Sequence, residues 1–382
     1  MTDVPRPDVA FVLAALRRDA GATRAQRDAA TRVDDWPAVT RLALAHDVGW
    51  WVERAMPSGA VTEHARAPLR EMVRTVAVSA LSGARQAVEL SGVLAAAGVR
   101  AVAYKGPALA ADVHGDVGAR WFTDLDFLIA EADRDRAVRA LRTAGYASPA
   151  GLSDRAERVY SRWEGVAHLA RGDAQPVELH WRCQAPRYGG PQDPADVVAR
   201  ARPCALGGGS VLVPAPDDLG VLLALHGVKH AWSSLMWVAD FVASASRPEF
   251  DWAAFTSRGD AWGVARALRY AMLVGHELAA LAPPPELLAA ARADGGAARL
   301  AHAVTARLTL AREVPDLGAE STPRYDLQWL DGVWAQARYL ALAAALPTPR
   351  ERAVAPLPDA LLPLAYPVRA WRLLRHAWDR RT

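Results

Sequence analysis

The chain has 382 residues, of which 52% are hydrophobic and 23% are charged, and its formal net charge is +3. These fractions are ordinary for a globular protein and argue against long disordered segments, and no block of like charges gives a strong nucleic-acid signature. The length allows two or three domains with substantial cores.

Membrane insertion and secretion are disfavoured by the sequence. No run of about 18 uncharged apolar residues occurs, so we expect no membrane span. The first residues carry an acid and two prolines where a signal peptide has basic residues, and we expect a cytoplasmic protein. Cys183 and Cys204 do not form a Cys-x-x-Cys pair, so neither a disulfide framework nor a zinc knuckle is indicated.

The predicted elements begin with helices and then change to short strands. Apolar residues recur at helical spacing from residue 8 to about residue 97, and Gly98 ends the pattern. Short apolar or alternating runs follow, separated by amphipathic segments and turn residues. In chain order we expect a strand over 99–106, a short helix over 107–115, a strand over 122–130, an amphipathic helix over 131–146 and a hairpin over 164–183.

The pattern becomes helical again from Pro214 onward. The three glycines at 207–209 are interpreted as a turn rather than as a phosphate-binding loop. The basic segment over 366–382 is expected to pack as a terminal helix with a solvated face, with an acidic partner or a membrane surface as the alternative. We therefore expect an α+β fold with an N-terminal helical region over 1–97, a small mixed-sheet core over 98–183 and a mainly helical region over 184–382.

Two acids at alternate positions of the strand over 122–130 form the first candidate site. Asp124 and Asp126 would leave the same face of a strand, while apolar residues line the other face. Neighbouring carboxylates repel each other, so burying them needs a cation, a basic partner or a shared proton. Glu178, in a later alternating run, would be a third acid facing the pair. Three convergent carboxylates suit a hard cation such as magnesium (Mg²⁺), and the alternative is a solvated strand end.

The sequence contains no asparagine and only two lysines among its 45 basic residues. The first, Lys105, forms a turn with Gly106 between a predicted strand and a helix, where an ammonium and free backbone amides favour phosphate. The second, Lys229, neighbours His226 and His230, which lie one helical turn apart. Both lysines are therefore candidate site residues.

Three interpretations of the histidine pair stay open. The pair could ligate zinc, although Gly227 stands where a zinc protease has its glutamate and no third ligand is evident. It could instead pack against Trp232 as a partly buried pair. In the third interpretation, Lys229 and the histidines reach an active site and contact substrate phosphates or an acceptor.

Three segments together resemble the nucleotidyltransferase superfamily, namely KGPALA, RWFTDLDFLI and VELHW. That superfamily combines a strand, a Gly-Gly or Gly-Ser turn into a helix, a strand with two acids, and a third acid on a later strand. More narrowly, residues from roughly 35 to 250 resemble a poorly characterised bacterial nucleotidyltransferase family with K-G-x-x-L, R-x-x-x-D-x-D and H-G-x-K-H-x-W blocks.

The resemblance implies a small mixed sheet flanked by helices, with the three acids as catalytic metal ligands. It also implies that Gly106 and the following helix start contact a triphosphate. Pro107 departs from the pattern because it stands where the superfamily has Gly or Ser and lacks an amide hydrogen. Phosphate contact then falls to the amides of Gly106 or Ala108 and to Lys105. Arg120, just before the first acid, is a candidate partner for a phosphate or a carboxylate.

The resulting hypothesis is a magnesium-dependent nucleotidyltransferase (EC 2.7.7.-) that moves NMP from a nucleoside triphosphate to an acceptor hydroxyl or phosphate and releases pyrophosphate. The acceptor stays open between a small molecule, a peptide and a protein, with RNA a weaker option, and the family resemblance extends to peptide natural-product tailoring. Two alternatives are a non-catalytic relative that binds a nucleotide or a partner, and a helical interaction protein whose α/β unit is merely structural.

Overall fold

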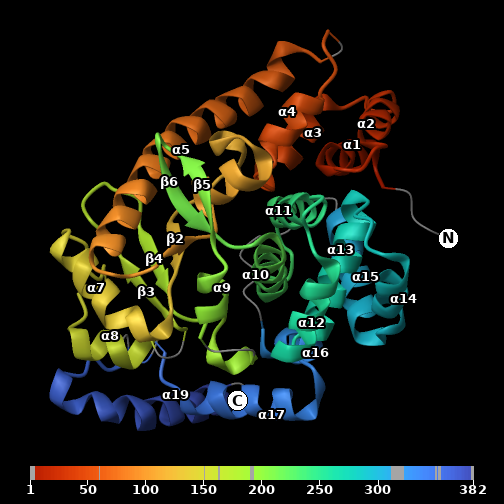
Figure 1. Cartoon of the computed structure of the whole chain (residues 1–382). Helices are drawn as coiled ribbons and strands as arrows, with labels where there is room; N and C mark the ends of the chain where they lie inside the picture. Colours follow the sequence, from red (N-terminus) through yellow and green to blue (C-terminus); the bar gives the residue numbers. More distant parts are fainter. Residues whose placement is uncertain are drawn as a thin grey trace.

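The computed structural model contains a six-stranded mixed sheet with helices on both of its faces (Figure 1). The α+β fold class expected from the sequence is thereby confirmed. The structure describes residues 5–379 apart from 60, 150, 162–163, 190–192, 311–321, 349–350 and 352–353.

The N-terminal helices end in one long helix that covers a face of the sheet. They are α1 (Pro7–Leu16), α2 (Ala22–Ala30), α3 (Trp36–Ala45), α4 (Gly49–Ala55) and α5 (Glu63–Ala96). Thr62 caps α5 by accepting a hydrogen bond from the amide of Ala65, and Gly98 follows its C-terminus at a φ of +71°. With 34 residues, α5 is about 51 Å long and crosses the sheet (Figure 1).

The sheet has the strand order β3-β4-β2-β1-β6-β5. Its strands are β1 (Val102–Ala103), β2 (Leu125–Leu128), β3 (Val166–Leu169), β4 (Val177–His180), β5 (Arg202–Leu206) and β6 (Gly209–Val213). β2 pairs with β4 and β1 pairs with β6 in parallel, and the other neighbours are antiparallel. The hairpin expected over 164–183 is confirmed as β3 and β4.

The sheet extends beyond residue 183, where the sequence-based core was expected to end. Gly207 and Gly208, both at positive φ, connect β5 to β6, and β6 returns beside β1. The glycine segment is therefore a turn, as expected, but it belongs to a hairpin of the central sheet. Gly207 also lies close to α5, where a Cβ atom would be 2.9 Å from the carbonyl carbon of Ala84.

Short helices fill the connections of the sheet. They are α6 (Gly106–Leu109), η1 (Ala110–His114), η2 (Val117–Ala119), η3 (Glu131–Asp133), α7 (Arg134–Thr143), α8 (Asp154–Ser161), η4 (Pro186–Tyr188) and α9 (Ala195–Ala199). The helices predicted over 107–115 and 131–146 are thus present.

The C-terminal part is helical, as expected. Its helices are α10 (Pro216–Lys229), α11 (Leu235–Ala245), α12 (Trp252–Trp262), α13 (Ala265–Ala279), α14 (Pro285–Ala293), α15 (Gly295–Leu310), α16 (Pro323–Trp329), α17 (Gly332–Ala345), η5 (Asp359–Leu364) and α19 (Ala365–Asp379).

The two faces of the sheet pack against different helices. Phe127 of β2 and Leu179 of β4 join the apolar core under α5. Leu128, the next residue of β2, instead joins a small cluster with Leu222 of α10. Because side chains alternate along a strand, the polar residues at alternate positions of β2 and β4 face α10 rather than the α5 core.

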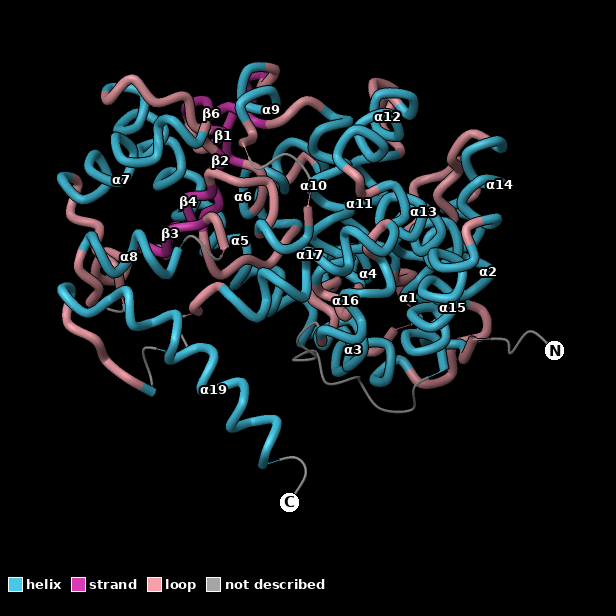
Figure 2. The backbone as a smooth tube through the Cα atoms, turned by 90° about the horizontal axis from the view of Figure 1, so that it is seen from below, coloured by secondary structure: helices cyan, strands magenta, loops and turns pink. Residues whose placement is uncertain are grey.

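The N-terminal and C-terminal helices share one apolar core, which the division into three sequence regions did not predict. Phe11, Val39 and Trp51 lie in the same buried cluster as Phe241 and Leu273. α1 contacts α13 of the C-terminal part. Figure 2 shows the N-terminal helices α1 to α4 on the same side of the molecule as α13 to α15. The helical wall that faces the sheet is therefore supported from both ends of the chain.

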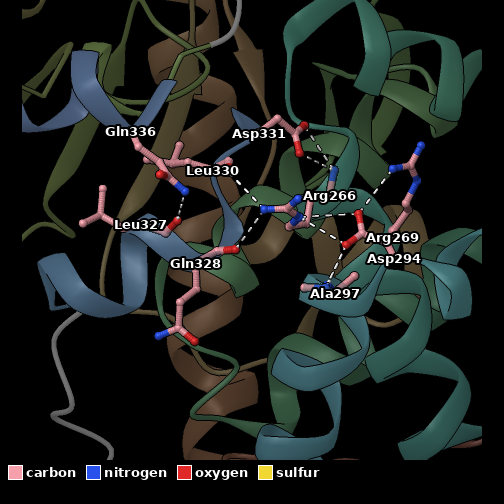
Figure 3. A network of polar contacts seen from close by, with 10 residues as sticks. Arg266, Arg269, Asp294, Ala297, Leu327, Gln328, Leu330, Asp331 and Gln336 are labelled. Carbon is pink, nitrogen blue, oxygen red and sulfur yellow. Dashed lines mark hydrogen bonds and ion pairs between the residues drawn. The ribbon is translucent and has the colours of Figure 1, made fainter. Parts of the chain in front are cut away.

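Arg266 of α13 joins several C-terminal helices (Figure 3). Its backbone amide donates to both oxygens of Asp331 at 3.2 Å, and its Nε donates to Asp294 at 3.2 Å. Its Nη1 donates to the carbonyls of Gln328 and Leu330 at 3.4 and 3.3 Å. Asp294 also accepts from two amides in the first turn of α15, so this network joins the ends of α14 and α16 to the starts of α13, α15 and α17.

The two last helices, α17 and α19, contact each other beneath the rest of the molecule (Figures 1 and 2). Arg369 and Arg372 of α19 pair with the buried carboxylate of Glu351 at 3.2 and 2.6 Å. The terminal segment is thus a packed helix, as expected, with Trp371 and Leu374 exposed and residues 380–382 outside the described residues. Within the described residues no helix combines the length and the apolar character that crossing a bilayer requires.

Candidate active site

A cleft of about 410 Å³ lies between the sheet and the helices α10 and α11. This volume is in the usual range for small-molecule sites. Eight of the nine site residues predicted from the sequence line it, namely Lys105, Arg120, Asp124, Asp126, Glu178, His226, Lys229 and His230. The fold therefore brings together residues that are separated by more than 100 positions.

The acids of the cleft are aligned by strand pairing. Asp126 lies directly opposite Glu178 in the parallel register of β2 and β4, so both carboxylates leave the same face of the sheet. His180, two residues after Glu178, shares that face, and its Nε2 lies 3.1 Å from Asp126 Oδ1 and 3.2 Å from Glu178 Oε2. Ligand atoms of these three residues lie within 4.8 Å of one another.

Asp126 is the most buried acid of this group. Its side chain is 1% exposed, and its Oδ1 accepts from the ammonium of Lys105 at 2.7 Å. Its Oδ2 has no hydrogen-bond partner among the described residues. Burial alone would raise the pKa of Asp126, but Lys105 and His180 lower it below its usual value. A buried carboxylate oxygen without a partner is costly, so this atom fits a bound cation.

Asp124 lies just before β2, because the strand begins at Leu125. It lines the cleft and is half-buried, but it does not belong to the compact group formed by Asp126, Glu178 and His180. Burial, followed by the charges of Asp126 and Glu178, raises the pKa of Asp124 to about 6. The Asp124 carboxylate is therefore protonated more readily than that of an ordinary aspartate.

The turn that carries Lys105 has the expected form. Gly106 has a φ of +56°, in the left-handed region that favours glycine, and it begins the four-residue helix α6. Gly106 is buried behind the cleft wall, while Lys105 reaches the cleft. Pro107 follows, so the second residue of the turn has no amide hydrogen to offer.

Arg120 has a buried carboxylate partner that was not singled out from the sequence. Its Nε donates to Oδ2 of Asp240 on α11 at 2.7 Å, and Nε2 of His114 lies 2.9 Å from the other oxygen of Asp240. All three side chains are at most 6% exposed. Burial alone would raise the pKa of Asp240, but Arg120 and His114 lower it. Of the two partners foreseen for Arg120, the carboxylate is the one present.

The helical wall of the cleft carries the histidine pair. The rings of His226 and His230 are 4.7 Å apart and both pack against Trp237, at 5.2 and 5.1 Å. Of the three open interpretations, the packed histidine pair is present, but its aromatic neighbour is Trp237, since Trp232 instead covers Gly227, where a Cβ atom would lie 2.5 Å from its ring. Burial, Lys105 and neighbouring charges lower the pKa of His226, and burial and Lys229 lower that of His230 to about 3, so both rings are neutral.

Lys229 reaches the cleft from the end of α10. Desolvation by the surrounding protein lowers the pKa of Lys229, and the charge of Glu164 opposes that shift. The side chain nevertheless reaches solvent through the cleft. Glu164 also lies 3.4 Å from His168, whose Nδ1 is 3.0 Å from Glu178. Hydrogen bonds that its ring nitrogens donate to the carboxylates of Glu164 and Glu178 raise the pKa of His168 to about 10.

Several cleft residues were missed by the sequence reasoning. They are Glu164, His168, His180 and Trp237. The two buried partners behind Arg120, namely His114 and Asp240, were missed as well. His180 carried a readable signal, since it alternates with Glu178 on one strand. Asp240 was readable only as an acid within the apolar run of α11.

Residues 33–280 match the model of a family described as an uncharacterised nucleotidyltransferase. The chain belongs to this nucleotidyltransferase family. The match covers well over half of the chain and includes every residue that lines the cleft, which confirms the resemblance stated from the sequence. Membership supports nucleotidyl transfer as the general function. No curated protein matches the chain.

Proposed function

We propose that this nucleotidyltransferase transfers NMP from a nucleoside triphosphate to an acceptor hydroxyl or phosphate and releases pyrophosphate, using a divalent metal. The observation that carries the proposal is the alignment of Asp126 with Glu178 in a cleft that Lys105, Arg120 and Lys229 also line. Acids beside cations suit a metal–triphosphate complex, which presents positive and negative charge together.

The residues present fit a divalent metal such as magnesium. Asp126 has a buried oxygen without a partner among the described residues, and Glu178 stands beside it. Burial, followed by the charges of Asp126 and Glu178, raises the pKa of Asp124, and a cation bound beside it would lower that pKa again. Asp126 and Glu178, with Asp124 beside them, would hold the metal, which would neutralise triphosphate charge and lower the pKa of an acceptor hydroxyl.

In this proposal, side chains rather than a glycine-rich loop neutralise the negative charge of the triphosphate. Pro107 removes one amide from the turn at Gly106, so Lys105 and Lys229 are the cations that we assign to the phosphates. Arg120 stays fixed by Asp240 and contributes positive charge to the same wall. The neutral rings of His226 and His230 supply hydrogen-bonding groups without adding charge.

One specific observation favours a second candidate, a relative that binds a nucleotide without turning it over. The ammonium of Lys105 already contacts Oδ1 of Asp126 at 2.7 Å, where it supplies the positive charge that a metal would supply. In such a protein, nucleotide would bind without a requirement for magnesium, and no product would form.

The test is a thermal shift of the purified chain with ATP, GTP, CTP and UTP, each with and without magnesium. Bound nucleotide at a hundredfold excess over its dissociation constant stabilises the fold by about 2.7 kcal/mol. We expect a magnesium-dependent rise in Tm that is lost in the Asp124→Asn/Asp126→Asn double variant. A rise that needs no magnesium supports the second candidate, and no rise with any nucleotide contradicts both.

A further inference from the structure

We propose that His180 is a ligand of the metal, together with Asp126 and Glu178, and that this nitrogen ligand makes the site select manganese over magnesium. The inference rests on the proposed function for the presence of a metal. It goes beyond that function in assigning His180 as a ligand and in naming the class of cation, a divalent ion of the first transition-metal row.

The first step is placement. Glu178 and His180 occupy alternate positions of β4, and Asp126 is paired with Glu178 across the parallel register. All three residues therefore present their side chains to the same cleft from the rigid centre of the sheet. The ring of His180 is further oriented by Tyr104, whose ring lies 5.6 Å away at 80°.

The second step is distance. One atom, His180 Nε2, lies 3.1 Å from Asp126 Oδ1 and 3.2 Å from Glu178 Oε2. Neighbouring ligands of an octahedral ion are separated by √2 times the bond length, which is about 3.0 Å for bonds of roughly 2.1 Å. Both distances are close to this value, so His180 Nε2 is spaced as a neighbouring ligand of one oxygen from each acid.

The third step is an independent observation that favours a cation beside Asp126. Oδ2 of Asp126 is buried and has no hydrogen-bond partner among the described residues, while Lys105 holds the other oxygen. A carboxylate that is 1% exposed would not keep an oxygen unpaired without cost. The group that pairs with this oxygen must be a hydrogen-bond donor or a small cation.

The fourth step is selectivity. Magnesium prefers oxygen ligands, whereas imidazole suits transition metals, and affinity for a mixed site rises from manganese onward along the first row. Two carboxylates leave the set rich in oxygen, and triphosphate would add more oxygen. Such a set favours octahedral manganese over tetrahedral zinc.

His168 provides a matched control. Its Nδ1 also contacts Glu178, at 3.0 Å, but its side chain is 51% exposed and it is not part of the compact group with Asp126. We assign it an orienting role toward Glu178 rather than a place on the metal.

The experiment measures Mn²⁺ binding to the full chain by electron paramagnetic resonance, with electron spin-echo modulation to detect a coordinated nitrogen. We expect bound Mn²⁺ with ¹⁴N modulation in the wild type. His180→Gln should lose the modulation and at least about tenfold of its preference for Mn²⁺ over Mg²⁺ in competition. His168→Gln should keep the nitrogen modulation and the preference, while the loss of its contact with Glu178 lowers the affinity for both ions alike.

Two results would overturn the inference in different ways. Bound Mn²⁺ without nitrogen modulation in the wild type, or with modulation kept in His180→Gln, removes His180 from the metal and leaves the proposed function intact. Binding that is absent in the wild type, or unchanged in Asp126→Asn, removes the metal centre itself. The wild-type modulation decides the ligand even where His180→Gln does not fold.

Discussion

Asp240 is predicted to be a main support of the cleft wall. The perturbation is Asp240→Asn, which keeps the shape of the side chain and removes its charge. Arg120 is 5% exposed, and in the variant its guanidinium would stay buried without an anionic partner. Breaking a buried ion pair by neutralising one member costs about 3–5 kcal/mol, because the remaining charge is left uncompensated.

The assay is urea unfolding followed by circular dichroism, in which the change in midpoint at constant slope gives the loss of stability. The matched control is Asp28→Asn, since Asp28 pairs with Arg24 at 3.6 Å with 62% and 89% of the two side chains exposed. Such a pair is worth below about 0.5 kcal/mol.

A second variant separates charge from packing. Adding Arg120→Met to Asp240→Asn removes the unpaired charge, so the double variant should regain at least about 1 kcal/mol relative to Asp240→Asn. A loss below about 1 kcal/mol in Asp240→Asn, or no recovery in the double variant, would refute the reasoning.

Three further predictions concern His46, Gly227 and the two lysines. Burial lowers the pKa of His46 to about 4, so the unfolded chain takes up its proton first as pH falls, and stability should drop by up to about 3 kcal/mol between pH 6.5 and 4. His46→Leu should remove that part of the slope in urea midpoints measured against pH. Gly227→Ala should cost about 1–3 kcal/mol in the same assay, because its methyl group meets the Trp232 ring. Reductive ¹³C-methylation, which keeps the charge, should give nuclear magnetic resonance signals for Lys105 and Lys229 that both shift on addition of a magnesium–nucleotide complex.

Each of these predictions has a contradicting result. Parallel pH profiles for wild type and His46→Leu would show that the ring is not buried in its neutral form. A neutral Gly227→Ala would show that Trp232 does not close over that position. A shift of the N-terminal amine signal without the lysine signals would place the nucleotide outside the cleft.

The strands of the site were predictable because their signals are local. The alternation around Asp126 and around Glu178 gave each side chain a face, and both faces turned out to be the same side of one sheet. The parallel pairing that sets the two side by side is not local, since about 50 residues separate β2 from β4. The alternation made Glu178 only a candidate to face the pair, and the family resemblance implied that the three acids share one site.

The contacts that hold the cleft wall in place could not be predicted from the sequence, because they also join segments that are far apart along the chain. Arg120 and Asp240 are 120 residues apart, and their pairing depends on how α11 packs against the sheet. The strand expected over 99–106 is present as β1, but its two residues gave no sign of a pairing with β6, and the added hairpin was seen only as a turn. The packing of Trp237 rather than Trp232 on the histidines follows from the backbone at Ala231 and Trp232, which both have positive φ.

The central claim is nucleotidyl transfer, and the bond that is cleaved tests it most directly. We would incubate the chain with the nucleoside triphosphate of highest affinity and a divalent metal, without added acceptor, and follow slow hydrolysis by ³¹P nuclear magnetic resonance. Water then takes the place of the acceptor at the α-phosphorus, so the account predicts NMP and pyrophosphate, with formation lost in Asp126→Asn and kept in Asp28→Asn. Formation of NDP and inorganic phosphate, or cleavage that survives Asp126→Asn, would contradict it.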